Sequence, residues 1–103
     1  MASSESYLRF VLDQLSALPE ITYRAMMGEF ILYGCGKIFG GIYDDRLLVK
    51  ATDAARAMMP GGREELPYPG AKPMLLVEQV DDRDFLQELV EAMLPELPDK
   101  KKQ

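Results

Sequence analysis

A chain of 103 residues with 48% hydrophobic and 28% charged residues has the size and composition of one globular domain, which can bury a core without disulfides. Histidine is absent and Cys35 is the single cysteine, which excludes His-based general bases, Ser–His and Cys–His nucleophile pairs, and His/Cys zinc sites. The net charge of −5 argues against binding driven by nucleic-acid phosphates, and no apolar run approaches a membrane span. We therefore expect a cytoplasmic domain without a metal, a cofactor or a membrane partner.

The first predicted element is a helix over residues 4–18. Its apolar residues recur at intervals of three and four and form one stripe: Tyr7, Leu8, Val11, Leu12, Leu15 and Leu18. The hydroxyl of Ser3 or Ser4 can cap its start, and Pro19 is expected to end it. We expect this helix to cover a sheet, with a partner-binding helix as the alternative.

Residues 21–50 change to the alternating pattern of β-strands. The predicted strands are residues 21–27 and the segments "EFILY", "KIFGGIY" and "RLLVK". Asp44–Asp45 predicts a two-residue hairpin turn, although a longer or type I loop is an alternative because aspartate tolerates positive φ less well than glycine. Gly34 and Gly36 are expected to supply positive φ at a tight turn around Cys35. Together these strands predict a β-meander.

The second half of the chain returns to mixed structure. A short helix is expected over residues 52–59, capped by Thr52 or Asp53. Residues 60–73 contain four prolines and three glycines and predict an irregular loop, which is either functional or a mere connector.

The last predicted elements are the strand "MLLVEQV" and a helix that begins at Asp81 or Asp82 and ends at Pro95. The whole order predicts a two-layer α+β domain over residues 1–98, with an antiparallel sheet of four to five strands and helices on one face. Residues 99–103 are expected to form a flexible basic tail.

The glycine-rich run over residues 28–41 does not fit a phosphate loop. "GCGKIFG" is one residue too long for the dinucleotide fingerprint, and β-like residues follow it where a helix is needed. Gly36-Lys37 is followed by Ile38, whereas a Walker loop needs serine or threonine there. We expect Gly40 and Gly41 to mark a bulge or a close contact within a strand.

The same region carries a family resemblance. "RAMMGEFILYGCGKIFGGIYDDRLLVK" resembles the R-x-M-F-G-x-x-x-x-Y-x-x-G-K-x-F signature and the following D-x-R/K-L-x-x-K segment of TfoX-like N-terminal domains. "LPYPGAKPMLLVE" and "LVEAMLPELPDKKK" resemble the P-Y-x-G-A-K-P stretch and the L-P-x-x-K end of one branch. The resemblance covers residues 5–102. The matching positions are Arg24, Met26, Gly28, Tyr33, Gly36, Lys37, Phe39, Arg46, Leu47, Lys50, Gly70, Ala71, Lys72 and Pro73.

This resemblance implies an α+β fold and a link to the regulation of competence for DNA uptake. It transfers no catalytic residue, and Met27 stands where phenylalanine is common. Longer regulators of this kind carry a second, helical domain, which we expect this chain to lack. Structural roles are expected for the motif residues Met26, Gly28, Tyr33, Gly36, Leu47, Gly70, Ala71 and Pro73.

Strand alternation predicts a working surface on the sheet face opposite the helices, called the far face below. In-register strands would gather Arg24, Lys37, Arg46 and Lys50 there with Met26, Phe39, Tyr43 and Leu48. Helices on one side would leave this face without cover, as in a partner site. Tyr68 and Lys72 in the loop complete the candidate surface.

Several functions are compatible with such a face. A homodimer or protein-partner interface is the first interpretation, and the non-catalytic regulatory domain implied by the resemblance would act through it. A single-stranded nucleic-acid platform would stack bases on Phe39 and Tyr43. An enzyme or small-ligand site would use Lys37, Lys72, Tyr68 or Cys35. In the plainest case the charges are only solvated and the aromatic rings fill gaps.

Overall fold

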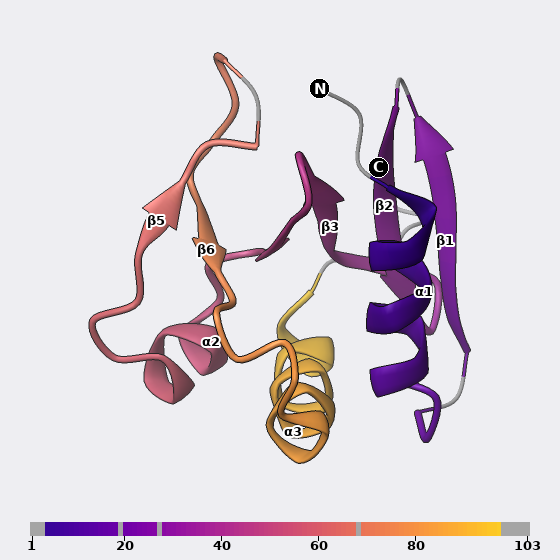
Figure 1. Cartoon of the computed structure of the whole chain (residues 1–103). Helices are drawn as coiled ribbons and strands as arrows, with labels where there is room; N and C mark the ends of the chain where they lie inside the picture. Colours follow the sequence, from indigo (N-terminus) through magenta and orange to yellow (C-terminus); the bar gives the residue numbers. More distant parts are fainter. Residues whose placement is uncertain (1–3, 19, 27, 68, 98–103) are drawn as a thin grey trace.

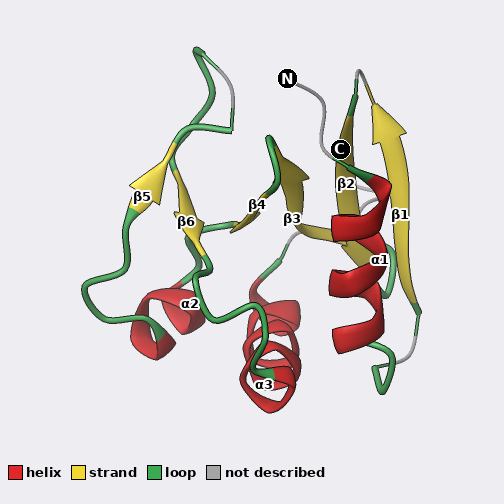
Figure 2. Ribbon diagram, viewed as in Figure 1, coloured by secondary structure: helices red, strands yellow, loops and turns green. Residues whose placement is uncertain are grey.

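The structure is a computed structural model that describes residues 4–18, 20–26, 28–67 and 69–97. Three helices lie on one side of an antiparallel sheet with the strand order β1-β2-β3-β4-β6-β5, as Figures 1 and 2 show. The predicted α+β class is therefore confirmed. The elements are α1 (Glu5–Gln14), β1 (Ile21–Met26), β2 (Glu29–Gly34), β3 (Lys37–Tyr43), β4 (Arg46–Val49), α2 (Asp53–Met58), β5 (Glu64–Glu65), β6 (Met74–Leu76), α3 (Arg83–Met93) and the 3-10 helix η1 (Leu94–Glu96).

Among the described residues the sheet has six strands, more than the four to five expected, because the proline-rich segment contributes β5. Glu64 pairs with Leu75 and Glu65 pairs with Met74 at this edge. Two adjacent glutamates carry no strand pattern in the sequence, since their pairing depends on the neighbouring strand β6 and not on local preference. Residues 60–73 are thus not wholly irregular, which corrects the prediction.

Side-chain caps start all three α-helices at predicted positions. Ser4 accepts a hydrogen bond from the Tyr7 N–H, Thr52 from the Ala55 N–H, and Asp82 from the Phe85 N–H. Asp45 in the β3–β4 turn accepts a hydrogen bond of 2.8 Å from the Ser4 N–H, which ties the start of α1 to the sheet.

Helix α1 ends at Gln14, four residues before the predicted end at 18. Leu15 and Leu18 still pack in or against the core from the turn that follows, so the apolar period continues after the helix has ended. Pro19, the predicted stop, lies outside the described residues.

Two-residue turns join β2 to β3 and β3 to β4. Cys35, Gly36, Asp44 and Asp45 all have positive φ, at 53°, 80°, 55° and 56°. The predicted two-residue hairpin at Asp44–Asp45 is confirmed. The prediction for Gly34 is wrong, because the left-handed residue before Gly36 is Cys35, whereas Gly34 lies in β2.

A bulge interrupts the pairing of β2 with β3, as the glycine pair suggested. Leu32 pairs with Gly40 while Tyr33 pairs with Ile38, so Phe39 is an extra residue in β3. A Cβ atom at Gly40 would lie 2.3 Å from the carbonyl oxygen of Leu48, which explains why only glycine fits there. The bulge exchanges the two sheet faces for the β3 side chains that precede Gly40, so the faces assigned to them by simple alternation change.

The core lies between the helices and one face of the sheet. The helices contribute buried residues such as Val11, Ala55, Leu86, Leu89 and Met93, and the strands contribute Leu32, Phe39, Ile42, Leu47 and Leu75. Burial of this apolar surface is the main stabilising contribution to the fold. The opposite side of the sheet is the far face.

Candidate functional site

The far face collects most of the side chains that alternation assigned to it. The strand registers place there Thr22, Arg24, Met26, Glu29, Ile31, Tyr33, Ile38, Tyr43, Arg46, Leu48, Glu65, Met74 and Leu76. Arg24 and Met26 are exposed near one edge of the sheet, whereas Tyr33 and Leu48 are buried. The structure therefore gives this face an exposed part and a covered part.

Two predicted members of this surface lie on the other side of the sheet. Phe39 is fully buried in the core, and the Lys37 ammonium donates a hydrogen bond of 3.2 Å to the Leu94 carbonyl of η1. The prediction that they share the far face is wrong, because the bulge at Phe39 shifts the alternation by one residue. Buried Phe39 also offers no stacking surface for a nucleic-acid base.

The far face is not free of cover, which corrects a second expectation. The Arg46 guanidinium contacts the Glu65 carboxylate of β5 in an ion pair and the Leu66 carbonyl at 3.5 Å, while its Nε donates to the Tyr43 carbonyl at 3.1 Å. These contacts hold the start of the proline-rich segment over strands β3 and β4. Leu48 below has no exposed surface although it faces away from the helices.

A hollow of about 520 Å³ lies where this segment passes over the far face. It is lined by Ile38, Tyr43, Lys50, Ala51, Pro67, Ala71, Lys72, Pro73 and Met74. Four of these residues, at 50, 71, 72 and 73, match the motif positions singled out in the sequence. The structure thus brings Tyr43, Lys50 and Lys72 of the candidate surface together.

Strand β1 is an edge of the sheet, and among the described residues no strand pairs with its outer side. The Cys35 N–H donates to the Glu20 carbonyl at 3.1 Å, so this pair is hydrogen-bonded. In an antiparallel ladder every second pair is hydrogen-bonded, which assigns Thr22, Arg24 and Met26 to bonds with β2. The N–H and C=O groups of Ile21, Tyr23 and Ala25 therefore point outward.

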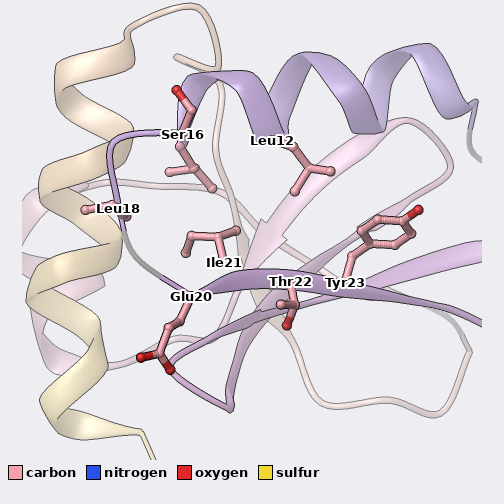
Figure 3. A pocket seen from close by; sticks show the side chains of 8 residues that line it. Leu12, Ser16, Leu18, Glu20, Ile21, Thr22 and Tyr23 are labelled. Carbon is pink, nitrogen blue, oxygen red and sulfur yellow. The ribbon is translucent and has the colours of Figure 1, made fainter.

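A second hollow, of about 430 Å³, lies between this edge strand and the end of α1 (Figure 3). Ile21 and Tyr23 point toward α1, while Glu20 and Thr22 point away from it, as Figure 3 shows. Tyr23 packs edge-on against Phe30, with ring centroids 5.9 Å apart, yet half of its surface is exposed. A large aromatic side chain thus stands beside the unpaired strand edge.

The residues proposed for an enzyme site do not meet at one place. Lys37 lies on the helix side of β3, Lys72 lines the far-face hollow, and exposed Cys35 occupies the β2–β3 turn. Tyr68 and the tail at 99–103 lie outside the described residues. In the described part of the chain, no three Cys, Asp or Glu side chains are grouped to hold a metal ion, and no helix has the length and apolarity to cross a membrane.

One titratable group has a shifted acidity. Partial burial, helped by the nearby Asp45 carboxylate, raises the pKa of the Tyr7 hydroxyl, and a backbone contact with Leu47 opposes the rise. Tyr7 packs against the core at the start of α1, so this shift belongs to the packing of α1 and not to either hollow.

The motif residues have the structural roles expected of them in several cases. Gly28, Gly36 and Gly70 have positive φ at 85°, 80° and 87°, and Leu47 lies in the core. Ala71 and Pro73 instead line the far-face hollow.

Two features of the candidate site could not be found from the sequence. They are the outward N–H and C=O groups of β1 and the ion pair of Glu65 with Arg46, because neither depends on a recognisable side-chain pattern. The exposed pairing edge of a terminal strand becomes visible only with the strand order.

Comparisons with known proteins find similarity over most of the chain. The model of the family described as "TfoX N-terminal domain" matches residues 13–94. An "Uncharacterized 12.7 kDa protein in trpE 5'region" from Spirochaeta aurantia is 34% identical over 99 residues, which cover 95% of this chain and 86% of that protein.

Proposed function

This chain belongs to the TfoX N-terminal domain family, and on that premise we propose that it is a non-catalytic regulatory domain that works as a homodimer joined through strand β1. The family suggests a domain like that of competence regulators. The observation that carries the dimer is the outer edge of β1, a six-residue strand without a β-bulge or a proline, which are two of the features by which edge strands block pairing.

The sequence of β1 suits pairing with a second copy in one register. A two-fold axis at Tyr23 pairs Tyr23 with its counterpart and Ile21 with Ala25 of the second copy. These are the residues whose N–H and C=O groups point outward, so each of the pairs forms two hydrogen bonds. A register shifted by one residue would place each residue whose N–H and C=O groups point outward opposite a residue whose groups are bonded inward to β2, so the hydrogen bonds between the two copies could not form.

Charges on the far face favour the same register. It places Arg24 opposite Thr22 of the second copy, with Glu20 of that copy at one diagonal position and its Arg24 at the other; Glu20 points to the same side of the strand as Thr22 (Figure 3). An axis at Arg24 would bring the two arginines directly opposite each other, where like charges destabilise a pair. Tyr23 of each copy would cover part of the partner's hollow beside α1.

Sedimentation equilibrium of Ala25→Pro tests the proposal. Proline removes the outward N–H of Ala25 and leaves the bonds from β1 to β2 intact, so we expect a folded monomer. Ala25→Val keeps that N–H and is the matched control, which should dimerise as the wild type does. A folded Ala25→Pro variant with unchanged dimer affinity contradicts the proposal.

A charge exchange supplies a test that does not depend on proline. Arg24→Glu would place two carboxylates diagonally across the interface, and we expect weaker dimerisation by several-fold. Glu20→Arg combined with Arg24→Glu restores opposite charges and should recover the wild-type affinity. Equal affinities for all three proteins would reject the Tyr23-centred register.

A further inference from the structure

The far-face hollow has the dimensions of a small-molecule site. Its volume of about 520 Å³ falls within the range of ligand pockets in proteins, roughly 300–1,000 Å³. The sheet supplies Ile38, Tyr43 and Met74 as apolar walls, and the segment above supplies Pro67, Ala71 and Pro73. Apolar walls with a few polar groups are typical of sites for organic molecules.

Two lysines that have no partner among the described residues give this hollow its charge. Lys50 follows β4 and Lys72 belongs to the covering segment, and neither has an ion pair or side-chain hydrogen bond with any described residue. The described lining contains no aspartate or glutamate. By contrast, Arg46, Arg56, Arg63 and Arg83 are each paired with a carboxylate.

The positive charge of the hollow contrasts with the acidic character of the whole chain. The protein carries a net charge of −5, yet two ammonium groups line one hollow whose described lining holds no carboxylate. The absence of an acidic side chain among the described lining residues leaves a local positive field at the two lysines. That field attracts an anionic group of a ligand.

We propose that this hollow binds a small organic anion, whose carboxylate or phosphate group pairs with Lys50 and Lys72 and whose apolar body lies against Ile38, Tyr43 and Pro67. Charge-assisted hydrogen bonds to two ammonium groups fix the anionic end of the ligand. The apolar walls select against inorganic anions, because only an organic body removes their surface from water.

The site is held in shape before a ligand arrives. The contacts of Arg46 with Glu65 and Leu66 fix the start of the covering segment, and Pro67 and Pro73 restrict its backbone. On the opposite wall, the ring of Tyr43 lies over β3, where a Cβ atom at Gly41 would come within 2.7 Å of Tyr43 Cε2. A pre-organised site loses less conformational entropy on binding.

Phenyl phosphate is a suitable probe, with binding followed by amide chemical shifts in ¹⁵N-labelled protein. We expect saturable shifts of the amides of residues 50, 51, 71, 72 and 74, and about tenfold weaker binding for Lys50→Met and for Lys72→Met. Arg9→Met removes one exposed positive charge from α1 and is the matched control, with unchanged affinity expected. Inorganic phosphate should bind at least about tenfold more weakly than phenyl phosphate.

The proposal is overturned if phenyl phosphate causes no saturable shifts, or if Lys50→Met/Lys72→Met binds it as tightly as the wild type does. Equal affinity for inorganic phosphate and phenyl phosphate would overturn the proposal that the apolar walls bind the organic body of the ligand. Titration of Ala25→Pro, with its changed β1 edge, should give the wild-type affinity. A failed dimer proposal is thereby distinguished from a failed ligand proposal.

Discussion

At the scale of single residues, Phe39 shows how one side chain changes the interpretation of a surface. Alternation within "KIFGGIY" assigns Phe39 to the far face, but the bulge turns it into the core, where it is fully buried. Its neighbours Lys37 and Ile38 exchange faces for the same reason. The role of Phe39 is therefore expected to be in stability and not in binding.

Phe39→Ala is expected to lower the free energy of unfolding by roughly 3–5 kcal/mol, because it opens a cavity in the core. Urea denaturation followed by circular dichroism measures this loss. Phe10→Ala is the matched control, since Phe10 is 41% exposed and its loss should cost less than about 1 kcal/mol. Similar costs for the two variants would place Phe39 outside the core.

At the scale of elements, the β2–β3 turn carries a residue that does not suit its backbone. Cys35 has a φ of 53°, a left-handed conformation that asparagine and glycine adopt more easily than other residues. It precedes Gly36, which has a φ of 80°. Asparagine followed by glycine is the sequence most favoured in such two-residue turns.

Cys35→Asn is therefore expected to raise the free energy of unfolding by about 0.5–1 kcal/mol, measured by urea denaturation under reducing conditions. Cys35→Ser also removes the thiol but has no preference for positive φ, so its stability should stay close to that of the wild type. A gain from serine as large as that from asparagine would show that loss of the thiol, and not the turn, is responsible.

The elements that the sequence predicted well are those defined by local chemistry. The caps at Ser4, Thr52 and Asp82 and the turn at Asp44–Asp45 depend on residues adjacent in the chain, and all were predictable. Strand β5 and the side occupied by Lys37 depend on a neighbouring strand, which local patterns do not report. The hollow could be predicted only in part, since Lys50 and Lys72 were candidates but nothing in the sequence placed them together.

At the scale of the whole molecule, the two proposed sites lie at different parts of one sheet. The dimer edge is β1, and the hollow is formed by β3, residues beside β4, and β6. Strand β2 separates them, so the distance between the sites is at least two strand spacings, about 10 Å. They share no residue among those that line the hollow or form β1. Sites separated in this way usually act additively.

Dimer formation and anion binding should therefore stabilise the fold independently. Raising the wild-type protein concentration tenfold should increase the unfolding free energy by about 1.4 kcal/mol per mole of dimer, whereas Ala25→Pro should show no such dependence. Phenyl phosphate at ten times its dissociation constant should add about 1.4 kcal/mol per chain to both proteins, because it binds only the folded hollow. Urea denaturation at two protein concentrations, with and without the probe, measures both increments. If the combined increment differs from the sum of the two separate increments by more than about 0.5 kcal/mol, the two sites are coupled through the sheet. The two sites would then not be independent surfaces.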